Sequence, residues 1–125
     1  MRMIVPLLAL ALPTAALAQS EGPWEPINIE TADGTTYAIQ RATITREATT
    51  VTLRTQMRRR EPSPSGLYRS TGRWRYDCAA RTVELLDYVV YGIGGETLET
   101  FEVPVPETEL VQPETAHDFI LRAIC

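Results

Sequence analysis

Two cysteines have the most definite chemistry in this 125-residue chain. Cys78 and Cys125 are its only cysteines, and in an oxidising compartment such a pair forms a disulfide. The pair lacks the Cys-x-x-Cys spacing of redox-active cysteines. Two cysteines and one histidine also cannot supply the four ligands of a structural zinc site. We therefore predict a structural disulfide between Cys78 and Cys125, and no metal site.

His117 is the single histidine. General acid–base catalysis or haem ligation there would require a partner group, and the neighbouring sequence specifies none. The chain also lacks a Gly-x-Ser-x-Gly motif, a phosphate-binding loop and a metal-ligand pair. Asp77 has no second carboxylate beside it, so we interpret it as a cross-strand charge partner. We expect His117 to be a partly exposed surface residue, and we predict a protein that is not an enzyme and needs no cofactor.

Arginine is concentrated in the middle of the chain, although the formal net charge is −4. The candidate binding patch consists of Arg54, Arg58, Arg59, Arg60, Arg73 and Arg75. If their strands present them on one face, they would attract an acidic glycan, a lipid or a protein. The alternative is that acids of later strands, such as Glu84 and Asp87, neutralise them. Nucleic acid is an unsuitable partner for an exported acidic protein.

The first residues have the features of a secretory signal peptide. Arg2 supplies a positive charge, an apolar run follows, and Ala16-Leu17-Ala18 matches the small-x-small cleavage pattern. We predict a signal peptide over residues 1–18. The apolar run is too short to span a membrane, and no later stretch reaches the ~20 residues that a transmembrane helix needs. No cysteine lies near the cleavage site, so we expect no lipid anchor there and a periplasmic or secreted protein.

Alternation of apolar and polar residues predicts a series of short β-strands after a flexible lead-in at 19–26. In one of them Trp74, Tyr76 and Cys78 share a face, and Arg73 and Arg75 share the opposite face. The expected strands cover residues 27–29, 35–40, 43–46, 49–57, 71–78, 82–91 and 98–103. Prolines 104 and 106 then stop sheet pairing, because proline cannot donate a ladder hydrogen bond. Residues 107–112 are expected to form a connector.

The last segment has the spacing of an amphipathic helix. Its apolar stripe is expected to consist of Ala116, Phe119, Ile120, Ala123 and Ile124. Strands followed by one helix indicate an α+β domain over residues 27–125, with one sheet and one helix. Because Cys78 shares a face with Trp74 and Tyr76, the disulfide should bring Phe119 and Ile120 onto those two aromatic residues.

The pattern of these features resembles the surface-adhesin protein E family of bacterial exported proteins. The matching residues are Trp24, Asp77-Cys78, Pro113-Glu114-Thr115 and Cys125. The resemblance implies a curved antiparallel sheet of about six strands, with the C-terminal helix tied to the concave face by the disulfide. It also implies adhesion to host proteins. No segment matches the binding regions of the lipid-anchored adhesin of this family, so no binding residue is transferred.

Two functions fit these observations. The first is an exported, non-enzymatic binding or adhesin-like module of unknown ligand, which would use the convex face of the sheet or the loop at 58–66. The second is a structural or accessory cell-envelope protein that acts through protein–protein contacts at a sheet edge. The expected partner is an unknown protein or an acidic glycan.

Overall fold

The computed structural model describes residues 22–125, so the predicted signal peptide lies outside the described residues. The elements are, in order, β1 (Glu25–Glu30), β2 (Thr36–Glu47), β3 (Thr50–Arg58), β4 (Arg69–Asp77), β5 (Thr82–Tyr91), β6 (Thr97–Glu102), β7 (Glu109–Leu110) and the helix α2 (Ala116–Ile124). Within the described part of the chain, strands come first and the single helix comes last, as predicted.

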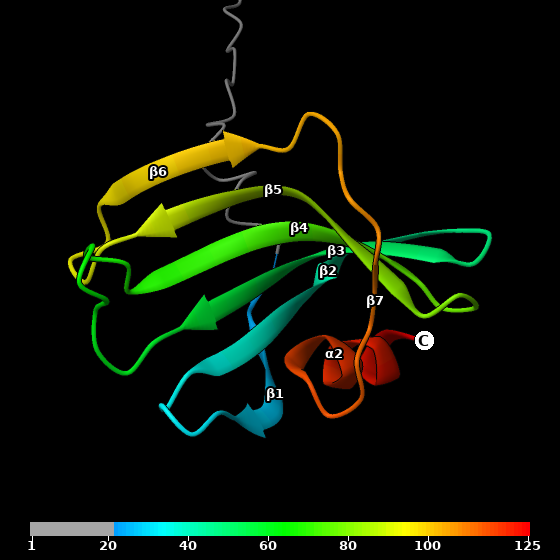
Figure 1. The fold of residues 1–125 in the computed structure, drawn as a ribbon, viewed down its shortest axis with the longest axis horizontal. Helices are drawn as coiled ribbons and strands as arrows, with labels where there is room; N and C mark the ends of the chain where they lie inside the picture. The colour runs from blue at the N-terminus through cyan, green and yellow to red at the C-terminus, as the bar shows by residue number, and fades with distance from the viewer. Residues whose placement is uncertain (1–21) are drawn as a thin grey trace, which may run out of the picture.

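The sheet is an antiparallel meander in the order β1-β2-β3-β4-β5-β6. Figure 1 shows that it is strongly curved and that α2 lies on its concave face. The predicted α+β class, sheet and helix position are therefore confirmed. The short strand β7 was not predicted. It pairs with the start of β5, where Leu110 lies opposite Thr82 and Glu109 lies opposite Val83.

The two separate strands predicted at 35–40 and 43–46 are one strand, β2. Its register with β3 shifts between Gln40 and Thr45. At this irregularity the Thr43 hydroxyl donates to the Gln40 carbonyl and accepts from the Arg54 backbone N–H, at 2.7 and 2.9 Å. A side chain thus replaces the missing ladder hydrogen bond, and the strand continues through a bulge.

The core lies between the concave face and α2. It is formed by Ile39, Val51, Leu53, Tyr76, Val83, Val111, Ile120, Leu121 and Ile124. Trp74 and Cys78 pack against this cluster, which confirms the face that Trp74, Tyr76 and Cys78 were predicted to share. The disulfide is also confirmed, with a Cα–Cα distance of 5.7 Å between Cys78 and Cys125.

The predicted apolar stripe of the helix was wrong in part. Leu121 is buried, whereas Ala123 is exposed and Phe119 is half-buried with the Arg122 guanidinium 4.7 Å from its ring centroid. The helix is rotated because its buried face also contains a charged residue, Asp118, which is only 4% exposed. Apolar periodicity alone could not include that residue.

Asp118 fixes the first turn of α2. Its carboxylate accepts hydrogen bonds from the Glu114 N–H at 3.0 Å, from Arg81 at 2.6 Å and from Arg122 at 2.9 Å. The Glu114 bond and the Arg81 guanidinium lower the pKa of Asp118. Thr115 caps the same turn by accepting from the Asp118 N–H. The helix is therefore held at its first turn by an ion-pair network and at its other end by the disulfide.

The interpretation of Asp77 as a cross-strand charge partner was wrong. Its carboxylate accepts hydrogen bonds from the N–H groups of Ala79 and Ala80, at 3.0 and 2.9 Å. These bonds, that from Ala80 foremost, lower its pKa. Asp77 therefore closes the turn between β4 and β5, which also positions Cys78.

Candidate functional site: a groove between the sheet and the helix

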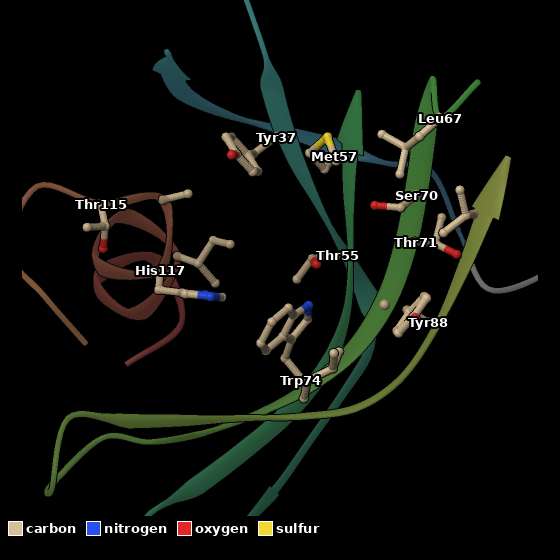
Figure 2. Close-up of a pocket in the computed structure, with 15 residues that line it drawn as sticks. Tyr37, Thr55, Met57, Leu67, Ser70, Thr71, Trp74, Tyr88, Thr115 and His117 are labelled. Atoms are coloured by element: carbon tan, nitrogen blue, oxygen red, sulfur yellow. The ribbon is translucent and has the colours of Figure 1, made fainter. Parts of the chain in front are cut away.

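A cavity of about 540 Å³ lies between the concave face and the first turns of α2; we call it the concave groove. Figure 2 shows side chains of the sheet and of the helix pointing into it from opposite sides. It is lined by Tyr37, Thr55, Met57, Leu67, Ser70, Thr71, Gly72, Trp74, Leu85, Tyr88, Val90, Thr115, Ala116, His117 and Ile120. Its volume lies within the range of ~300–1,000 Å³ that is usual for small-molecule sites.

Three neighbouring cross-strand rows form the floor of the concave groove, because directly opposite residues of an antiparallel sheet share a face. The rows are Tyr37, Met57, Ser70 and Val90; then Thr55, Gly72 and Tyr88; then Trp74 and Leu85. The floor therefore depends on the register of four strands. The sheet is curved, with the helix on its concave face (Figure 1), so these rows face the helix without packing flat against it.

Gly72 makes room for the indole of Trp74. A Cβ atom at this position would lie 3.0 Å from the Trp74 Nε1 atom and 3.3 Å from the backbone oxygen of Asp87. Both distances are shorter than ordinary van der Waals contacts. The glycine in the middle of β4 thus allows the ring to lie low against the strand, where it forms part of the groove wall (Figure 2).

His117 is partly exposed, as expected, but it lies in the wall of this groove, which the sequence did not predict. Its ring centroid is 4.5 Å from that of Trp74 in an edge-to-face arrangement, and its Nδ1 atom is 2.9 Å from the Tyr76 hydroxyl. Burial lowers the pKa of His117 and raises the pKa of Tyr76. Both groups are therefore neutral at pH 7, and the fully buried Tyr76 hydroxyl holds the His117 ring in the groove wall.

The arrangement fits binding better than catalysis. Tyr76 occupies one nitrogen of His117, and none of the described residues that line the concave groove is a carboxylate or a cysteine. The described residues include no group of three or more His, Cys, Asp or Glu side chains that could hold a metal ion. The groove offers apolar walls, aromatic rings and a few hydroxyl groups, which can position a ligand.

The predicted arginine residues lie elsewhere. Arg54 faces Arg73 across β3 and β4, and Arg58 faces Arg69, on the side of the sheet away from the helix. Arg59 and Arg60 lie in the loop after β3, where they line a small cavity with acidic side chains.

Two members of the predicted patch contact carboxylates. Arg73 donates to Asp87 and Arg75 donates to Glu84, both at 2.9 Å, which is the neutralising alternative considered for these residues. Arg69, which was not part of the predicted patch, lies opposite Arg58.

The family comparison gives these observations a context. The family model for surface-adhesin protein E matches residues 24–125, from the early tryptophan to the last cysteine. The chain belongs to the surface-adhesin protein E family. This is a family of binding proteins rather than of enzymes, and surface adhesins are exported. No curated protein matches the sequence.

The confirmed disulfide agrees with export of this surface-adhesin protein E member. Among the described residues, no helix has the length and apolar character needed to cross a membrane.

The concave groove was not predicted from the sequence. The alternation around Trp74 and Tyr76 placed those rings on the helix side, but it did not show an open space beside them. A usable signal was Gly72, two residues before Trp74 on the same face of a strand otherwise occupied by larger side chains.

Proposed function

We propose that this protein is an exported binding module without enzymatic activity, and that its ligand enters the concave groove. The protein would act in the periplasm or outside the cell. The observation that carries the proposal is an open cavity of about 540 Å³ with tyrosine, tryptophan, methionine and valine side chains in its walls. Such surface would normally collapse into the core, because exposed apolar area costs about 25 cal/mol per Å². A ligand that covers it recovers that free energy.

The groove is preorganised for this role. Each wall is fixed independently of a ligand: the floor by the sheet register, Trp74 by Gly72, and the helical wall by Asp118 and the disulfide. Preorganised walls lose little conformational entropy when a ligand binds.

The test uses chemical-shift mapping of the mature protein by NMR, with the neutral probe 4-phenylbutan-1-ol. We expect shifts to concentrate in residues 70–74 and 115–120. A Ser70→Phe variant, which fills the groove floor, should abolish them, whereas Ser65→Phe in the exposed loop after β3 should not. Shifts spread evenly over the surface, or unchanged in Ser70→Phe, would contradict the proposal.

A second candidate site is the arginine face on the other side of the sheet. Arg58 and Arg69 face each other directly, and like charges in that position normally destabilise a sheet, whereas Arg73 is already paired with Asp87. Binding an acidic glycan would compensate for this repulsion. We expect retention on heparin at low salt that falls as salt screens the charges over about 8 Å at physiological ionic strength.

The variant Arg58→Glu/Arg69→Glu, which reverses the directly opposed pair, should lose retention on heparin. Wild-type protein that passes heparin at low salt would rule this site out. In either case Arg73→Glu/Arg75→Glu should lower the melting temperature, because both residues contact a carboxylate.

A further inference from the structure

A second cavity of about 260 Å³ adjoins the concave groove. Trp74 and Leu85 line both spaces, so the indole stands at the boundary between them. The remaining lining residues of this side cavity are Val83, Val103, Val105, Glu107 and Glu109. The two cavities therefore share this wall on the concave face, and most of their lining residues are apolar.

The segment that carries Glu107 and Glu109 is fixed by contacts with β5. The Thr108 hydroxyl, between the two glutamates in sequence, donates to the Glu84 carboxylate at 3.0 Å. Glu109 belongs to β7 and pairs with Val83 of β5. Alternate residues of an extended chain point to opposite sides. With Thr108 directed at β5, its two glutamate neighbours therefore face the cavity.

The charged residues of the two cavities lie on one side only, in the side cavity. Among the described residues that line the two cavities, Glu107 and Glu109 are the only ones charged at pH 7, because burial keeps His117 neutral. Glu109 raises the pKa of His117 against that effect, which places its negative field at the end of the concave groove. The nearby Arg75 and Arg81 are engaged with Glu84 and Asp118.

We propose that the ligand of the concave groove is a small organic cation: an aromatic or aliphatic body that fills the groove and a single amine or guanidinium group that reaches Glu107 and Glu109 beside Trp74. This inference rests on the proposed function and specifies its ligand class. Carboxylates next to an indole ring are suited to a cation, since the ring face attracts positive charge and the acids neutralise it. An anionic ligand of the same shape would meet like charge at this end.

The experiment compares three probes that share one body: 4-phenylbutylamine, 4-phenylbutan-1-ol and 4-phenylbutyrate. Dissociation constants are measured by NMR titration on the mature protein at low salt. We expect the amine to bind about tenfold more tightly than the alcohol, and the carboxylate most weakly, from one exposed ion pair and one cation–π contact. The preference for the amine should shrink at high salt, whereas the affinity of the alcohol should not.

The variant Glu107→Gln/Glu109→Gln should bind the amine and the alcohol equally. Its control is Glu47→Gln/Glu61→Gln, which removes the same charge at exposed positions that line neither cavity and should keep the preference. If the amine and the alcohol bind wild type equally, the cation inference is overturned and the groove proposal stands. If none of the three probes shifts the groove residues, the groove proposal itself fails.

Discussion

Removal of the disulfide is the perturbation whose size follows most directly from the structure. Cys78 and Cys125 are separated by 47 positions in the sequence. In the chain-entropy model, cross-linking a loop of this length destabilises the unfolded state by about 4 kcal/mol. Small domains have free energies of unfolding of about 5–15 kcal/mol, so the bond supplies a large share of the stability. We expect Cys78→Ser/Cys125→Ser to fold only marginally at 25 °C.

The assay is urea unfolding followed by tryptophan fluorescence, in a Trp24→Phe background that leaves Trp74 as the single reporter. With an m-value of about 2 kcal/mol/M, the loss should lower the urea midpoint by about 2 M. Replacing both cysteines avoids a free thiol that could form mixed disulfides. The oxidised parent and the same parent treated with reductant serve as controls.

The reasoning would be refuted by a midpoint that stays within about 0.3 M of the parent at an unchanged m-value. That result would mean that the contacts of Ile120, Leu121 and Ile124 hold the helix on the sheet without the bond. A midpoint that falls in the double variant but not on reduction of the parent would point to a loss of packing by the serine side chains instead.

Three further predictions concern the groove. The pKa of His117 lies below its ordinary value of 6.5, so the folded state resists its protonation; the free energy of unfolding should decrease as the pH falls below about 6.5, and less so in His117→Gln. Gly72→Ala should displace the Trp74 indole, changing its near-UV circular dichroism and costing about 1 kcal/mol of stability in urea unfolding. Asp118→Asn removes the charge that Arg81 contacts, so it should weaken binding of the groove probes at pH 7. The pKa of Asp118 is lowered in the folded state, so its charge stabilises the fold at neutral pH and this contribution is lost as the carboxylate is protonated. Wild-type protein should therefore approach the variant at acidic pH.

The sheet could be predicted well because its signal is local. Strict alternation of apolar and polar residues over the segments that form β3 and β4 determines which residues share a face. The face of Trp74, Tyr76 and Cys78 then determines where the helix must pack. The two cysteines supplied the one long-range constraint, and it was sufficient to place α2 on the face of Trp74 and Tyr76. That this face is the concave one was implied by the family resemblance.

The rest depended on interactions between residues distant in sequence. The rotation of α2 follows from the contact between Asp118 and Arg81, which are 37 residues apart. The groove exists because four curved strands contribute to its floor and Gly72 makes room for Trp74, so no single segment predicts that space. Likewise, Glu107 and Glu109 become neighbours of Trp74 only through the pairing of β7 with β5.

The helix wall of the groove and the disulfide lie at opposite ends of α2. Thr115, Ala116 and His117 face the ligand space at the start of the helix, whereas Cys125 follows its last residue. The start is held by Asp118 and by the bond between His117 and Tyr76, neither of which involves sulfur. If the end of α2 at Cys125 is released, the core contacts near that end should loosen before the ligand wall does. The disulfide therefore stabilises the domain as a whole, while the ion pair between Asp118 and Arg81 holds the turn of α2 that forms the ligand wall.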